Sequence, residues 1–420
     1  MISKITPDKN LVRGEIISGI LMASFLHNKE SGFKSKKGVN TYLHLYKKTA
    51  IGLLFFLAIG IIYPGFCRAA PGISADAAIL MDVSTGQILY DKNGSKRRSP
   101  ASLTKILTGI IALEYGHLGE VVTVSQKAGA VSTGSTIGLR TGDQITLGNL
   151  LEAALLHSAN DSTVAIAEHI ALTHDNFIHL MNKKLIALGA FDSHFSNTNG
   201  YSSPNHYSTA RDLAVITRYA LQNEEFNRLV KTKEITIAWY DPVKEKKIKN
   251  TNRLLANQEY PGIDGVKTGT AIRAGKCLIA SATREGRRLV AIVLHSSKRY
   301  SDAVELLDYG FNNTKLYVLC KEGQTFPGIA VKEGVKSTVS VAAKEEVSVY
   351  LDAREPPEVQ GRVVAFKPVA PVQKGDIVGR VIFETEQGEL ARTDLVATEN
   401  VRKPWWPAWW PAWWPARIWR

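Results

Sequence analysis

Cysteine is scarce in this chain of 420 residues. Only Cys67, Cys277 and Cys320 occur, which excludes the dense disulfide framework of small secreted domains. Cys277 and Cys320 are expected either to form one bridge in an oxidising compartment or to be two small buried residues. The chain also lacks CxxC and HExxH strings, so neither a metal site nor a cofactor is expected.

Acidic residues are outnumbered, with 39 Asp and Glu against 52 Lys and Arg and a net charge of +13. The excess lies near the ends of the chain. Residues 1–48 hold nine basic and three acidic residues, and residues 402–420 hold four basic residues and no acidic one. Both segments lie beside apolar stretches, so the charge indicates membrane targeting, and no nucleic-acid partner is expected.

The uncharged apolar run at residues 51–63 is shorter than the roughly 20 residues that a spanning helix needs. Lys47 and Lys48 precede it, and small residues follow it near Ala69. This pattern predicts a secretory leader over residues 1–69, cleaved near Ala69, with an uncleaved anchor as the alternative. Met1 and Met22 both fit as the start of the chain. The mature protein is therefore expected outside the cytoplasm.

The length of the chain suits two folded domains. In the first, at residues 70–315, a strand hairpin, several helices and a second strand hairpin follow one another, which predicts an α+β domain. The expected hairpins are 77–82 with 87–90 and 277–283 with 288–294, and the expected helices are 102–115, 147–157 and 160–172.

A small all-β domain is predicted at residues 316–401. Its expected strands, separated by Gly and Pro, include 337–341, 346–350 and 377–383. The tail at residues 402–420 repeats Trp-Trp-Pro-Ala and holds seven of the eight tryptophans. Its prolines exclude a continuous α-helix. Trp beside Arg favours the lipid headgroup layer, so the tail is expected to bind a membrane surface, with a disordered tail or a sequencing artefact as alternatives.

Three short motifs follow one another along the first domain. In the first, Ser102-Leu-Thr-Lys105, the serine and the lysine lie one helical turn apart, so the amine can reach the hydroxyl. A buried lysine beside another cation can lose its proton and serve as general base for a serine nucleophile. The alternative for Ser102 alone is an ordinary helix cap.

The second motif, Ser158-Ala-Asn160, lies between two predicted helices. Its hydroxyl can relay a proton to a leaving amine, and its amide can hold a peptide. A helix cap is again the alternative.

The third motif, Lys267-Thr-Gly269, precedes the second predicted hairpin. Gly269 would let a substrate backbone approach the strand closely. Thr268 and Thr270 could bind a carboxylate, and Lys267 supplies positive charge. Taken alone, this lysine would most often be a solvated surface charge.

The three motifs in this order resemble those of the active-site serine penicillin-binding proteins and β-lactamases. The resemblance narrows to the D-alanyl-D-alanine carboxypeptidases of peptidase family S11. It covers residues 75–313, and the β domain resembles the C-terminal domain of that family. The stretches that carry the narrower resemblance are residues 98–108, 205–214, 264–270 and 274–277.

This resemblance implies a β-lactamase/transpeptidase-like fold and a set of roles. Ser102 would be acylated with Lys105 as its base, Ser158 and Asn160 would assist proton transfer and substrate binding, and Lys267, Thr268 and Gly269 would line the opposite strand. The backbone amides of Ser102 and Thr270 would form the oxyanion hole, and Arg299 would help to hold a terminal carboxylate. Residues 197–201 and 271–273 depart from the usual family spelling, which bears on substrate preference.

The implied activity is removal of the terminal D-alanine from peptidoglycan stem peptides, with β-lactams as covalent inhibitors of the same serine. A β-lactamase is the first alternative, but no Glu-x-x-Leu-Asn string follows Asn160. The second alternative is a wall-binding scaffold without turnover. A scaffold would not require Ser102, Lys105, Ser158 and Lys267 together.

Overall fold

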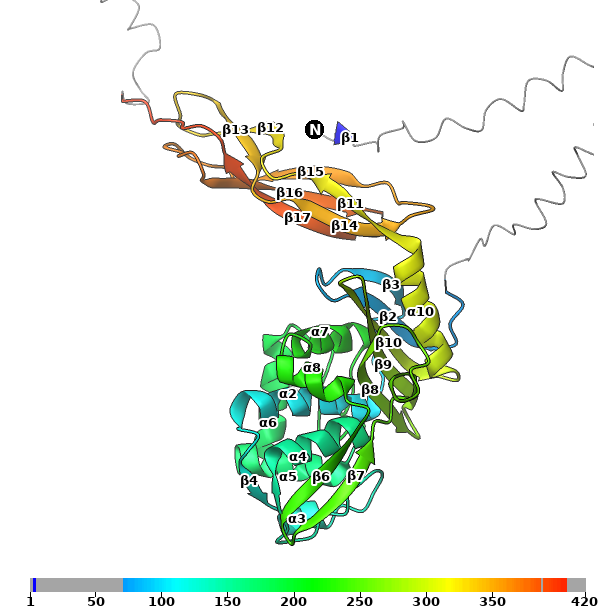
Figure 1. The fold of residues 1–420 in the computed structure, drawn as a ribbon. Coiled ribbons are helices and arrows are strands. Elements are labelled where there is room, and N and C mark those ends of the chain that lie inside the picture. The colour runs from blue at the N-terminus through cyan, green and yellow to red at the C-terminus, as the bar shows by residue number, and fades with distance from the viewer. Residues whose placement is uncertain (1–2, 5–70, 387, 406–420) are drawn as a thin grey trace, which may run out of the picture. The chain divides into compact units, whose positions relative to one another are not determined.

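The structure is a computed structural model that describes residues 3–4, 71–386 and 388–405 of the chain. The predicted apolar core of the leader and nearly all of the Trp-rich tail lie outside these residues. Ahead of residue 71 the structure describes only the short strand β1 (Ser3–Lys4). From residue 71 onward an α+β region is followed along the chain by a region made of strands (Figure 1).

A five-stranded antiparallel sheet in the order β3-β2-β10-β9-β8 is the centre of the α+β region. Both predicted hairpins are confirmed, because β2 pairs with β3 and β9 pairs with β10. The turn of the second hairpin contains Glu285 and Gly286, both at positive φ, as a tight hairpin turn favours. The strands are β2 (Ala77–Asp82), β3 (Ile88–Lys92), β8 (Ile263–Ala271), β9 (Gly275–Arg284) and β10 (Arg287–Ser296).

Alternating side chains of the sheet bury its two faces in different cores. Ile79 of β2 belongs to a large core shared with the helices of residues 101–231, whereas the next residue, Leu80, packs with Leu306 of α10 (Arg299–Asn313). Figure 1 shows α10 on one side of the sheet and the labelled helices of the preceding region, such as α2 (Lys105–Tyr115), α7 (Ala210–Ala220) and α8 (Glu224–Lys231), on the other. The sheet is therefore covered on both faces, and β8 is one of its two edge strands.

The helices that follow the first hairpin hold two of the three motifs. The predicted helix at 102–115 begins with a 3₁₀ turn, and the predicted helix at 147–157 ends in a π-helical turn. The helical elements are η2 (Ala101–Thr104), α2 (Lys105–Tyr115), α3 (Gln126–Gly129), α4 (Leu147–Glu152), the π turn η3 (Ala153–His157), α5 (Asn160–Ala171), α6 (His174–Ala187), α7 (Ala210–Ala220), α8 (Glu224–Lys231), α9 (Arg253–Ala256) and α10 (Arg299–Asn313).

A second antiparallel sheet, in the order β4-β5-β6-β7, packs with this helical layer. Its long hairpin was not among the predicted elements. Trp239 of β6 is buried and donates its indole N–H to the buried Asp143 at 3.1 Å. The strands are β4 (Val121–Thr123), β5 (Gln144–Thr146), β6 (Glu234–Asp241) and β7 (Lys244–Lys249).

The region from residue 314 is all-β, as predicted. Five of its strands pair in the order β15-β16-β17-β13-β12, and β11 pairs with β14. Alternate side chains such as Val381 and Phe383 of β16 form its core. The strands are β11 (Thr314–Cys320), β12 (Thr325–Ala330), β13 (Thr338–Ala343), β14 (Val347–Asp352), β15 (Gln360–Ala365), β16 (Ile377–Thr385) and β17 (Gly388–Ala397).

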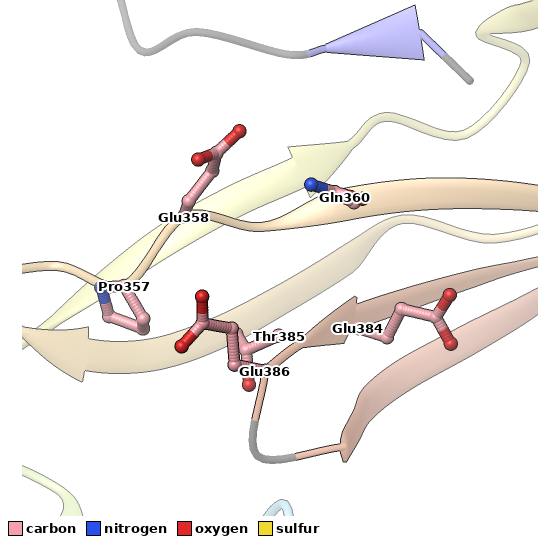
Figure 2. Close-up of a pocket in the computed structure, with 6 residues that line it drawn as sticks. All are labelled: Pro357, Glu358, Gln360, Glu384, Thr385 and Glu386. Carbon is pink, nitrogen blue, oxygen red and sulfur yellow. The ribbon is translucent and has the colours of Figure 1, made fainter.

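A hollow of about 470 Å³ in the β region contains three glutamates, of which Glu384 pairs with Arg362. None of the predicted site residues lines this hollow. Figure 2 shows the lining residues, which are Pro357, Glu358, Gln360, Glu384, Thr385 and Glu386.

Cys277 and Cys320 are both buried and unpaired in the structure, so the single-bridge alternative is not observed. In the described part of the chain, none of the helices has the length and apolar character needed to cross a membrane.

Candidate active site

Ser102 and Lys105 stand at the junction of η2 and α2. Lys105 Nζ lies 2.9 Å from Ser102 Oγ, which is the contact that their spacing predicts. Neither η2 nor α2 has a side-chain cap at its start. The helix-cap interpretation of Ser102 is therefore wrong.

Lys105 is fully buried and has three oxygen partners. Besides Ser102, its ammonium nitrogen lies 2.7 Å from Asn160 Oδ1 and 2.8 Å from the carbonyl oxygen of Asn199. Burial places the pKa of Lys105 well below its usual 10.5, and the nearby charge of Lys267 lowers this pKa further, while Asp161 opposes the shift. The neutral amine is therefore more accessible than in an ordinary lysine, and this amine lies against a serine hydroxyl.

Ser158 occupies an unusual backbone position. It follows the π turn η3 and has φ 65° and ψ 29°, a left-handed conformation that serine rarely adopts. Such strained positions next to π turns concentrate at functional sites. The Ser158 side chain is mostly buried, and its hydroxyl has no hydrogen-bond partner within the described residues.

Asn160 links Lys105 to the loop on the other side of the cleft. Its amide oxygen accepts from Lys105, so the amide nitrogen must be the donor to the Thr133 carbonyl at 2.7 Å. Helix α5 starts here without a side-chain cap. The capping alternative for Ser158 and Asn160 is therefore also wrong.

Asp161 was not among the predicted site residues. It holds the loop that follows Thr133 through hydrogen bonds to the loop backbone. Its buried carboxylate accepts the backbone N–H groups of Ile137, Gly138 and Leu139 at 2.9–3.2 Å. This carboxylate gave no signal in the sequence, because the three loop N–H groups that it accepts lie more than twenty residues away.

Strand β8 brings the third motif to the start of η2. A Cβ at Gly269 would lie 3.0 Å from the carbonyl oxygen of Pro100 and 3.2 Å from the backbone nitrogen of Ser102. Glycine is needed here because the protein's own backbone approaches closely, and the predicted approach of a substrate backbone to Gly269 stays a prediction. Lys267 is fully buried, and burial lowers its pKa to about 7, with the charge of Arg299 contributing.

The remaining predicted residues differ in their orientation. The Thr268 hydroxyl contacts Thr251 Oγ1 at 2.6 Å, and Thr268 is absent from the lining of the cleft. Thr270 does line the cleft, and Arg299 donates to its hydroxyl at 2.8 Å and to the Gly269 carbonyl at 3.0 Å. Arg299 therefore supports the end of β8 beside Thr270.

The cleft above Ser102 has a volume of about 520 Å³. Two of its walls are the loop around Thr133 and the loop around Gly200, neither of which was among the predicted site residues. The full lining is Ser102, Thr133, Gly134, Asn160, Asn199, Gly200, Tyr201, Ser202, Pro204, Thr270, Ala271, Ile272 and Arg273.

Gly200 offers a stability test of this close packing. It has φ 88°, and an added Cβ would lie 1.8 Å from the carbonyl oxygen of Ala101. Gly142 has φ 89° with nothing within 4 Å of the same position. Gly142→Ala is expected to cost about 1–2 kcal/mol of unfolding free energy for its backbone conformation alone.

Gly200→Ala is expected to cost a further 1–3 kcal/mol or so, because the backbone must shift to relieve the clash. Urea unfolding of both variants measures the difference. Equal losses would show that the loop does not press on Ala101.

The geometry provides a serine beside a desolvated amine, two further polar side chains and an open cleft. A nucleophile hydrogen-bonded to a base of lowered pKa is the arrangement used in acyl transfer.

Comparison with known proteins agrees with this chemistry. Residues 65–298 match the family model for D-alanyl-D-alanine carboxypeptidase, and residues 311–403 match the C-terminal domain of penicillin-binding protein 5. D-alanyl-D-alanine carboxypeptidase DacF of Bacillus subtilis is 32% identical over 344 residues, which cover 78% of this chain and 86% of the relative. DacC of Escherichia coli is 32% identical over 80% of this chain and 86% of the relative.

Solved structures match this chain over different shares of its length. Penicillin binding protein 5 from Haemophilus influenzae matches with a TM-score of 0.66 at 30% identity and covers 80% of this chain and 99% of its own. The Streptomyces K15 DD-transpeptidase matches with a TM-score of 0.55 at 34% identity over 58% of this chain and 99% of its own. The chain therefore belongs to the D-alanyl-D-alanine carboxypeptidases of peptidase family S11 and is a penicillin-binding serine carboxypeptidase.

Proposed function

We propose that Ser102 is the nucleophile of this carboxypeptidase and Lys105 its general base. The observation that carries the proposal is the 2.9 Å contact between Lys105 Nζ and Ser102 Oγ, made by a lysine whose pKa burial has lowered. A neutral Lys105 accepts the hydroxyl proton as the oxygen attacks.

In the first half-reaction, Ser102 Oγ attacks the carbonyl carbon between the two terminal D-alanines of a stem peptide. The proton passes to Lys105, and the backbone amides of Ser102 and Thr270 stabilise the oxyanion. The C–N bond then breaks, and the leaving amine receives a proton from Lys105 through the Ser158 hydroxyl. D-Alanine departs and leaves an ester on Ser102. Water then hydrolyses this ester, which releases the shortened peptide and restores the Ser102 hydroxyl.

Residues on two sides of the cleft, at Asn160 and at Thr270, bind the substrate. Asn160 presents an amide already oriented by Lys105 and Thr133. Thr270 and Lys267 on β8, together with Arg299 at the start of α10, favour the terminal carboxylate of the peptide. Thr268 and Gly269 shape this strand. The proposed carboxypeptidase domain is residues 70–315, and the β domain is 316–401.

Product analysis tests the activity. Purified protein is incubated separately with a fluorescent penicillin and with diacetyl-L-Lys-D-Ala-D-Ala, and covalent label and free D-alanine are followed. We expect a slowly clearing label and released D-alanine, with release blocked by prior treatment with penicillin. Rapid hydrolysis of penicillin would favour a β-lactamase, and label without D-alanine release would favour a wall-binding scaffold.

We also propose that the chain acts outside the cytoplasm, where its substrate lies, after export by the leader at residues 1–69. The Trp-rich tail would then bind the membrane surface through its tryptophan and arginine side chains. Deletion of residues 403–420 is expected to move the protein from the membrane fraction to the soluble fraction. Unchanged partitioning in a flotation assay would contradict the role of the tail.

A further inference from the structure

His206 is a buried titratable group that the proposed chemistry does not use. It is 1% exposed and stacks on Phe195 with ring centroids 5.0 Å apart and an interplanar angle of 15°. Its Nε2 lies 2.8 Å from the hydroxyl of Thr104, and its Nδ1 lies 3.1 Å from the backbone nitrogen of Ser196. Thr104 is the residue between Leu103 and Lys105, so the imidazole lies directly behind the motif that holds Ser102.

The donor and the acceptor of each hydrogen bond made by His206 and Thr104 follow from the chemistry of their partners. A backbone N–H only donates, so His206 Nδ1 must accept from Ser196 and carry no proton. In the neutral ring the proton is then on Nε2, which donates to Thr104 Oγ1. This leaves the Thr104 hydroxyl proton for the carbonyl oxygen of Ala101, which lies 2.9 Å away. A chain of two hydrogen bonds therefore runs from His206 through Thr104 to Ala101.

This chain of hydrogen bonds reaches Ser102 through the backbone of Ala101. It precedes Ser102 and has φ 49°, a left-handed conformation unfavourable for alanine. Its carbonyl oxygen lies against Gly200, where an added Cβ would approach it to 1.8 Å. Because Ala101 and Ser102 share one peptide plane, the orientation of this carbonyl also fixes the direction of the Ser102 N–H.

We propose that His206 is a positioning residue that acts through Thr104, holding the Ala101–Ser102 peptide so that the Ser102 amide and hydroxyl face the cleft. The proposal rests on the proposed role of Ser102 as nucleophile. Neither His206 nor Thr104 lines the cleft, so both act on the reaction through the backbone. Burial lowers the pKa of His206 to about 4, with smaller contributions from His194 and Lys105. The ring therefore stays neutral, and its donor stays on Nε2, at neutral pH.

Matched substitutions at Thr104 test the proposal. Thr104→Val keeps the shape but removes the hydroxyl, whereas Thr104→Ser keeps the hydroxyl and removes a methyl group. The rate constant for covalent labelling by fluorescent penicillin is measured at neutral pH, together with the labelled fraction at completion and the melting temperature. Thr104→Val is expected to label to completion about tenfold to a hundredfold more slowly, because misplacement by an ångström or less costs this much. Thr104→Ser is expected to stay within about threefold of the unchanged protein.

Two substitutions at His206 form the second pair. His206→Gln keeps a side-chain N–H donor, whereas His206→Phe keeps a ring but removes the donor. Slow labelling is expected for His206→Phe, and it should not be slowed further when Thr104→Val is added, because the two residues act in one chain. Additive losses, or an unchanged rate constant in Thr104→Val, would overturn the inference while leaving Ser102 as nucleophile. A lowered melting temperature with a normal rate constant would show that the group is only structural. Failure of the unchanged protein to be labelled would instead contradict the proposed function.

Discussion

Replacement of Ser102 by alanine is expected to abolish covalent labelling by penicillin and to reduce D-alanine release by roughly 10⁴-fold or more, as loss of a nucleophile does in other serine hydrolases. The reason is chemical, since no acyl-enzyme forms without the Ser102 oxygen. Folding should be preserved. Ser102 is only half-buried, and its hydroxyl caps no helix.

Ser202 supplies the matched control, because it lines the same cleft and also carries a hydroxyl. Ser202→Ala is expected to retain labelling and D-alanine release within about tenfold of the unchanged protein. Gel fluorescence and a coupled D-alanine assay measure both variants. Persistent labelling of Ser102→Ala would show that another residue is acylated.

Replacement of Lys105 by methionine is expected to lower the acylation rate constant by about 10²–10⁴-fold, the contribution of a positioned general base. Methionine fills a similar buried volume, but it removes the amine that now contacts Ser102, Asn160 and Asn199. Stopped-flow labelling with a fluorescent penicillin measures the rate constant, and the labelled fraction at completion reports how much protein is folded.

The pH dependence separates a base from a merely structural lysine. Because the pKa of Lys105 lies well below 10.5, the neutral amine forms at lower pH than for an ordinary lysine. Acylation of the unchanged protein should therefore rise with pH through this lowered pKa and then level off. In Lys105→Met this rising limb should disappear. A rising limb of the same midpoint in the variant would assign it to another group.

Several elements that depend on the local sequence pattern were predicted, although the hairpin of β6 and β7 was not. Short apolar runs on either side of Ser84 and of Glu285 predicted both hairpins of the central sheet, and the spacing of Ser102 and Lys105 predicted their contact. The order of strands, helices and strands was enough for the fold class, because few architectures bury such a pattern.

Features that depend on tertiary contacts were missed. The Asn199 carbonyl, a third partner of Lys105, is a backbone group that no residue type reveals. The Thr268 hydroxyl faces Thr251 because strand register, set by pairing with β9, decides which side chains reach the cleft. The π turn before Ser158 and the buried imidazole of His206 also arise from packing between segments far apart in the chain.

The central claim, that Ser102 is the residue acylated, is tested most directly by locating the penicillin adduct. Labelled protein is digested with trypsin, and the peptide covering residues 99–105 is fragmented in a mass spectrometer. That peptide contains only two serines, Ser99 and Ser102. We predict the intact penicilloyl mass on Ser102. An adduct on Ser99, on Ser158 or on any other residue would contradict the mechanism.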